Sequence, residues 1–61
     1  MTPKRIVALR KRLKLTQRQL AERIGAQQPT VARWEIGENK PRGANLKALR
    51  ELEIEAKKKT P

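Results

Sequence analysis

The sequence contains no cysteine, histidine, aspartate, serine, tyrosine or phenylalanine, and Trp34 is its only aromatic residue. Without cysteine and histidine the chain can form neither disulfides nor the zinc sites that those ligands build, so no metal site is expected. Most catalytic nucleophiles and general bases are also missing, which predicts that the chain is not an enzyme and has no catalytic residues. Neither a cofactor nor a small-molecule ligand is expected.

Long hydrophobic runs are absent too. The longest is IVAL, residues 6–9, which is too short to cross a bilayer, and no membrane partner is expected. A chain of 61 residues is one domain near the lower size limit for a stable hydrophobic core. A core with one aromatic residue suits packed helices better than a sandwich or barrel, so we predict a single all-α domain over residues 1–61.

Positive charge is abundant instead. Sixteen lysines and arginines face six acidic residues, and the net charge is +10. Residues 1–18 contain no acid and hold the densest group of cations: Lys4, Arg5, Arg10, Lys11, Arg12, Lys14 and Arg18. Such a balance indicates an acidic partner, with nucleic acid as the first candidate and an anionic membrane surface as the second.

The spacing of apolar residues predicts four helices, over about 4–13, 17–24, 28–36 and from about 44 onward. Thr16 and Gln19 form the pattern TQRQ, typical of a capping box, and Gly25 can end the second helix in the left-handed conformation. Pro29 is compatible with a first helical turn. We expect the core within about 4–54 and a basic tail over 55–61. The expected inward-facing residues are Ile6, Leu9, Leu13, Leu20, Ala21, Ile24, Val31, Trp34, Leu46, Leu49 and Leu52.

The third predicted helix has two distinct faces. At about 100° per residue Val31 and Trp34 fall on one side, which predicts the buried face. The opposite face is nearly flat, with a small alanine among longer polar residues; it consists of Gln28, Pro29, Ala32 and Arg33. This face fits a major groove, where Gln pairs with adenine and Arg with guanine. For Gln27 two interpretations stay open, a helix cap and a base contact.

The stretch LTQRQLAERIGAQQPTVARWEIGENKP resembles the helix-turn-helix of the lambda-repressor/Cro-like (XRE) family. The matching positions, which extend over roughly residues 6–52, are Gln17, Leu20, Ala21, Gly25, Val31, Trp34, Glu35, Gly37 and Pro41. The resemblance implies a compact four-helix domain with its helix-turn-helix at about 17–36. Family members usually carry a fifth helix after residue 52, where this chain has EIEAKKKTP, so a truncated five-helix domain is the other description.

The resemblance also implies which residues meet DNA. The expected base contacts are Gln27, Gln28, Pro29 and Arg33. The expected phosphate or minor-groove contacts are Gln17, Arg18, Thr30, Lys40 and Arg42. Arg10 and Glu35 match a partly buried salt bridge of phage repressors. Pro29 departs from the family pattern, which often has Gln or Ser there, and offers an apolar contact such as one to a thymine methyl group.

The leading functional hypothesis is a sequence-specific transcriptional regulator of double-stranded DNA, a small Cro-like repressor of phage or bacterial type. It would bind as a homodimer on DNA and act in the cytoplasm, on the nucleoid. The alternative is a protein-interaction module on the same fold, of antitoxin, coactivator or phage type, whose partner is RNA polymerase or another protein. In that case Leu49, Leu52 or Ile54 would meet the partner. A basic amphipathic membrane binder is a third and weaker hypothesis.

Overall fold

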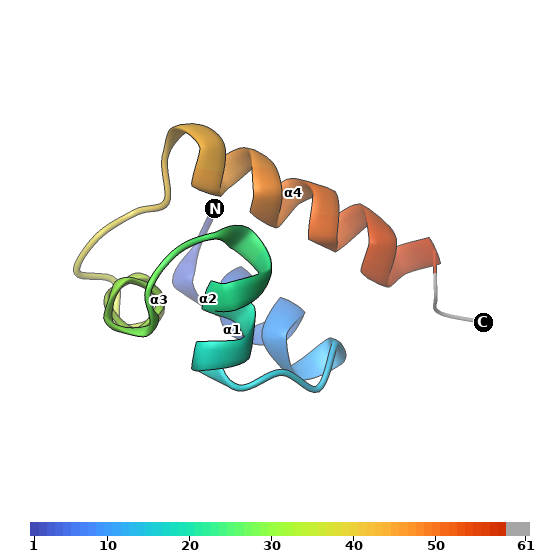
Figure 1. Cartoon of the computed structure of the whole chain (residues 1–61), viewed down its shortest axis with the longest axis horizontal. Helices are drawn as coiled ribbons and strands as arrows, with labels where there is room; N and C mark the ends of the chain where they lie inside the picture. The colour runs from blue at the N-terminus through green and yellow to red at the C-terminus, as the bar shows by residue number, and fades with distance from the viewer. Residues whose placement is uncertain (59–61) are drawn as a thin grey trace.

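The computed structural model describes residues 1–58, which form an all-α domain without strands in that range. The helices are α1 (Pro3–Arg12), α2 (Gln17–Ile24), α3 (Gln28–Glu35) and α4 (Gly43–Lys58). Helices α2 and α3 pack against each other, while the long α4 lies across α1 and α2 (Figure 1). The predicted all-α, four-helix fold is therefore confirmed over the described residues.

Local capping signals set the start of α2 and the turn that follows it. The Thr16 hydroxyl accepts a hydrogen bond from the Gln19 backbone N–H at 3.1 Å, and the Gln19 side chain accepts one from the Thr16 backbone N–H at 2.9 Å. This reciprocal capping box satisfies two backbone donors that the helix itself leaves unpaired. Gly25 ends α2 with φ of +74°, a left-handed conformation that glycine adopts at low cost.

The core draws residues from all four helices. Its buried members are Ile6, Leu9, Leu20, Ala21, Val31, Trp34, Leu49, Leu52 and Ala56. Leu13 and Ile24 pack against this cluster as partly buried residues, and Leu46 is half-buried, so these three contribute less than the sequence predicts. Trp34, only 3% exposed, fixes α3 to the remainder of the domain.

Helix α4, predicted from about residue 44 onward, continues through the first part of the expected basic tail. Residues 55–58, expected to belong to a basic tail, form its last turn, and Ala56 is buried in the core. The rest of that expected tail, residues 59–61, lies outside the described residues. The core therefore extends beyond residue 54. An ion pair also joins α1 to α4: Arg5 donates from Nη2 to Glu53 Oε1 at 2.8 Å and from Nε to Glu53 Oε2 at 3.2 Å.

Candidate nucleic-acid interface

Helix α3 presents a polar face to solvent because its opposite face is anchored. Val31 is fully buried and Trp34 nearly so, whereas the side chains of Gln28, Pro29 and Arg33 are exposed. Pro29 lies in the first turn, where its missing N–H interrupts no helical hydrogen bond. The structure thus places on one exposed face three of the four residues that the sequence predicts as base contacts.

A chain of side-chain hydrogen bonds connects α1, α2 and α3 beside this face. Arg10 donates from Nε to Glu35 Oε2 at 2.7 Å and from Nη2 to Oε1 at 3.0 Å. Gln17 Nε2 donates to Glu35 Oε1 at 3.0 Å, and Gln28 Nε2 donates to Gln17 Oε1 at 2.8 Å. The ion pair that the resemblance implies is thus present, and it is the first link of a network ending on the exposed face.

The network leaves a defined set of polar atoms for a ligand. An amide NH₂ has two N–H groups, and Gln28 uses one of them on Gln17. Its second N–H and its carbonyl oxygen stay available, which is the donor–acceptor pair that matches an adenine edge. Gln17 likewise keeps one N–H, at the first residue of α2, where free backbone N–H groups favour an anion. Sequence reasoning treated these two glutamines as independent contacts and missed their coupling.

The electrostatics of Glu35 hold the network in its charged form. Burial of Glu35, whose side chain is 7% exposed, raises its pKa. Hydrogen bonds from Arg10 and Gln17, together with the charges of Arg10 and Lys11, lower it, and the net pKa is below the ordinary value. The hydrogen bond with Glu35 in turn raises the pKa of Arg10. Both groups therefore stay ionised at neutral pH, and the carboxylate accepts from Gln17 as well as from Arg10.

Gln27 and Arg18 occupy the ends of the two helices of the motif. Gln27 is the N-cap residue of α3, but its exposed side chain makes no capping hydrogen bond. The cap interpretation of this side chain is therefore wrong, and its amide is available to a ligand. Arg18 is exposed in the first turn of α2, next to Gln17.

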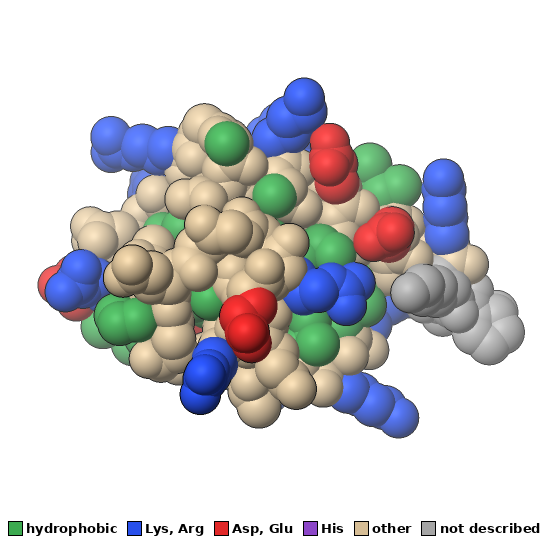
Figure 2. All heavy atoms as spheres, in the orientation of Figure 1, with side chains coloured by type: hydrophobic (Ala, Val, Ile, Leu, Met, Phe, Trp, Pro, Cys, Tyr) green, Lys and Arg blue, Asp and Glu red, His purple; other side chains and the backbone are tan. Residues whose placement is uncertain are grey.

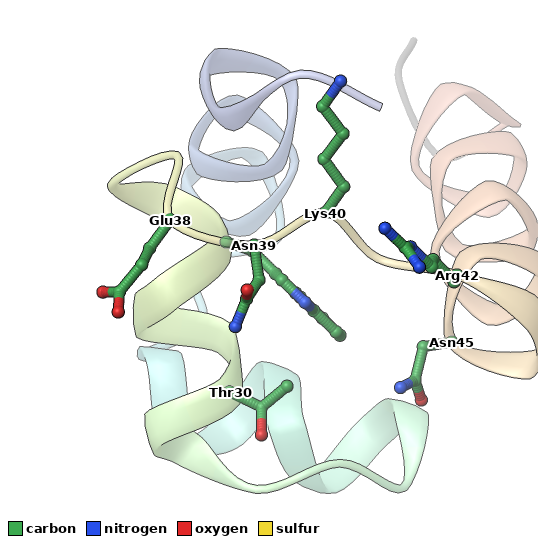
Figure 3. Close-up of a pocket in the computed structure, with 7 residues that line it drawn as sticks. Thr30, Glu38, Asn39, Lys40, Arg42 and Asn45 are labelled. Atoms are coloured by element: carbon green, nitrogen blue, oxygen red, sulfur yellow. The ribbon is translucent and has the colours of Figure 1, made fainter.

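The remaining predicted contacts gather around a hollow of about 600 Å³ between α3 and α4 (Figure 3). It is lined by Thr30, Trp34, Glu38, Asn39, Lys40, Arg42 and Asn45. Thr30 projects from α3, while Arg42 and Asn45 approach from the start of α4, and the Lys40 side chain extends away from the centre. The hollow thus unites Thr30, Lys40 and Arg42 in a region rich in hydrogen-bond donors, which suits an anionic backbone.

Sequence reasoning missed two residues of this region. Asn39 and Asn45 line the hollow with amides, and only the fold brings them together. Ile36, which helical register places on the same side as Pro29, directly follows the last residue of α3 and has 74% of its surface exposed.

On the face shown in Figure 2 positive charge is spread out instead of forming one patch. Lysine and arginine side chains project on several sides of this face, and acidic side chains lie among them. Within residues 1–58 no group of His, Cys, Asp or Glu side chains could hold a metal ion. In the same range no helix has the length and apolar character needed to span a membrane.

A helix-turn-helix family model matches residues 6–52, which is most of the chain. Together with the fold and the exposed face of α3, this match shows that the chain belongs to the XRE-type, lambda-repressor-like helix-turn-helix family of DNA-binding domains. The chain is also 46% identical over 43 residues to the type II methyltransferase M.SsoII of Shigella sonnei. That match covers 66% of this chain but only 11% of the methyltransferase.

Proposed function

We propose that this domain is a sequence-specific transcriptional regulator of double-stranded DNA, a small Cro-like repressor that reads the major groove with α3. The observation that carries the proposal is the hydrogen-bonded pair of Gln17 and Gln28 beside the exposed Arg33. An ordinary solvated helix face needs no side chain held by a neighbouring helix. Here the Gln28 amide is oriented before any ligand arrives, which lowers the entropy cost of a directed contact.

Each predicted contact has a definite role in this proposal. Gln28 pairs with adenine, Arg33 with the two acceptors of guanine, and Pro29 meets a thymine methyl group. Gln17 and Arg18 approach a phosphate at the N-terminus of α2. Thr30, Lys40 and Arg42 hold the backbone, or the minor groove between half-sites, at the hollow between α3 and α4. Gln27 borders the groove at the start of α3.

Repression follows from where such a domain would sit. Two copies bound to a palindromic site would cover one face of the duplex, with half-sites about one helical turn apart. RNA polymerase would then be unable to bind a promoter that overlaps this site. The proposed role is that of a binding domain on the nucleoid and not of an enzyme, because the 61 residues lack the Cys, His, Asp and Ser side chains that most catalytic sites use.

Selection of bound duplexes from a random pool tests this proposal most directly. A palindromic consensus is expected, with adenine and guanine at the positions facing Gln28 and Arg33. The same experiment reports half-site spacing, and therefore whether two copies bind. Enrichment of no sequence, with equal affinity for unrelated duplexes, would refute sequence-specific regulation.

A second candidate function is a protein-interaction module, and the exposed apolar surface of α4 favours it. Ile54 is 54% exposed on α4. Leu49 and Leu52, which the sequence offered as further partner contacts, are 0% and 7% exposed, so that part of the expectation is wrong. Binding to an acidic protein without detectable duplex affinity at low salt would support this function over the first.

A further inference from the structure

Two hollows flank α1, one beside the end of α4 and one beside the end of α3. One, of about 410 Å³, lies between α1 and the end of α4; it is lined by Ala8, Leu9, Lys11, Arg12, Glu53, Ala56 and Lys57. The other, of about 360 Å³, lies between the start of α1 and the end of α3; it is lined by Pro3, Lys4, Val7, Ala8, Lys11 and Glu35. Ala8 and Lys11 line both hollows, and the exposed face of α1 lies between them; we call this face, with the hollow on each side of it, the α1 groove.

The floor of the α1 groove is apolar, and two of its residues are alanines. Ala8 is exposed between the two hollows, and Ala56 is the nearest core residue of α4. Val7 and Pro3 continue the apolar floor toward the start of α1. A lysine or arginine stem beside such a floor contributes methylene groups while its charged end stays in water. The groove can therefore bury apolar side chains of another molecule.

The rim of the α1 groove is positive. Its two acids are already engaged inside the chain, Glu53 with Arg5 and Glu35 with Arg10. Lys4, Lys11 and Lys57 form no ion pair within residues 1–58. An occupant would thus meet apolar contacts beside ammonium groups that have no ion-pair partner within residues 1–58.

We propose that the α1 groove docks an acidic amphipathic helix of a partner protein. The stripe of residues 4, 7, 8 and 11 on α1 has the spacing of one helix face. An amphipathic helix laid along this face would place its apolar side chains in the hollow on each side of it. A nucleic-acid backbone fits less well, because Val7, Ala8 and Ala56 offer no side-chain donor to a phosphate. A second copy of the chain fits less well too, because each copy carries +10. This interaction goes beyond the proposed DNA-binding function.

The test uses a helical 16-residue peptide with leucines on one face and glutamates elsewhere. The control peptide has the same composition in scrambled order, so it has the same charge without an apolar face. At about 0.15 M salt, amide NMR shifts of the ¹⁵N-labelled chain should saturate at Ala8, Leu9 and Ala56. A Kd on the order of 10 μM is expected, as suits a small transient interface. Equal binding of the scrambled peptide would overturn the proposal, because it would reduce the effect to general charge attraction.

Matched variants localise the site. Lys57→Glu should weaken peptide binding at least about tenfold, whereas Lys58→Glu, one residue further along the same helix end and outside the groove, should weaken it far less. Ala8→Gln fills the floor without changing charge, and Ala44→Gln is its control at another exposed alanine. Thermal unfolding of all four variants verifies that each is folded. Equal effects within each pair would overturn the assignment.

The same variants separate this inference from the proposed function. Duplex selection and operator affinity should be alike for Lys57→Glu and Lys58→Glu, because both remove the same charge. If peptide docking fails while sequence-specific DNA binding persists, only the inference is wrong. If a duplex shifts the Ala8, Leu9 and Ala56 amides as the peptide was expected to, the groove belongs to the DNA footprint and the proposed docking site is wrong.

Discussion

Removal of the exposed arginine of α3 tests whether this helix contacts bases or only attracts the phosphate backbone. Arg33 carries a fork of donors on the outward face. We expect Arg33→Ala to cost about 1–3 kcal/mol on the preferred site and to relax preference at one base pair. Binding to a panel of single-base operator variants measures this. Arg50→Ala removes an equal charge from the exposed side of α4 and serves as the control. If Arg33→Ala weakened binding to all operator variants equally, Arg33 would be a phosphate contact.

Two arginine–glutamate pairs in this chain differ mainly in exposure, which allows a matched comparison. Both join α1 to another helix through two hydrogen bonds. In the first pair Arg10 is 19% and Glu35 7% exposed, and Glu35 also accepts from Gln17. In the second pair Arg5 is 57% and Glu53 20% exposed. We expect Glu35→Gln to lower the free energy of unfolding by about 1–3 kcal/mol and Glu53→Gln by less than about 1 kcal/mol. Urea denaturation measures both, and equal losses would contradict the role of burial.

Glu35 should also give the domain a stability that depends on pH. Its pKa is lower in the folded chain than the ordinary value of 4.5, because the hydrogen bonds and charges around it outweigh burial. A lowered folded pKa stabilises the fold above the unfolded pKa, and this contribution is lost as the pH falls through the folded pKa. We therefore expect the stability gap between the native chain and Glu35→Gln to be constant above pH 4.5 and to shrink below it.

At the scale of the element, the capping box of Thr16 and Gln19 fixes where α2 starts and thus where Gln17 lies. Thr16→Ala removes the acceptor for the Gln19 backbone N–H and should cost about 1 kcal/mol of unfolding free energy. Thr16→Ser keeps an oxygen in place and should restore most of that loss. Thr2→Ala removes the equivalent cap of α1, near the chain terminus where fraying limits the cost. Thermal or urea unfolding checks the order; equal effects of Ala and Ser at position 16 would contradict it.

Helix ends set by local chemistry were predictable from the sequence, whereas burial set by packing between helices was not. The capping box and Gly25 predicted the bounds of α2 from the sequence alone, and Pro29 lies in a first turn as predicted. The burial of Ala56 near the end of α4 was not predicted, because it depends on the other helices that pack against that turn. Sequence spacing identifies apolar faces, but it contains no information on which distant helix will cover them.

The same distinction applies to the candidate interface. The two faces of α3 followed from helical periodicity, and Val31 and Trp34 are buried as predicted. The hydrogen bond between Gln17 and Gln28 could not be predicted in this way, because it depends on the angle between α2 and α3. Nor could spacing show that Asn39 and Asn45 line the same hollow as Thr30. The properties of a single helix can be predicted from the sequence, whereas the contacts between two helices can be described only once the fold is known.

At the scale of the whole molecule, a net charge of +10 sets how the domain responds to salt. Each neutralised phosphate releases counterions, so the logarithm of the binding constant falls linearly with the logarithm of salt concentration. With about five to eight phosphates contacted per copy, the expected slope is roughly −4 to −7. Operator affinity measured from low to physiological salt gives this slope.

The size of the change in slope distinguishes backbone contacts from base contacts. Lys40→Ala, at the hollow between α3 and α4, should weaken binding about equally on all duplexes and reduce the slope by about one. Gln28→Ala changes no charge, so it should leave the slope unchanged while lowering preference for adenine at one position. A shallow slope for the native chain, or a reduction by Gln28→Ala as large as that by Lys40→Ala, would mean that phosphate attraction and sequence reading are not divided between the loop and α3 as the geometry requires.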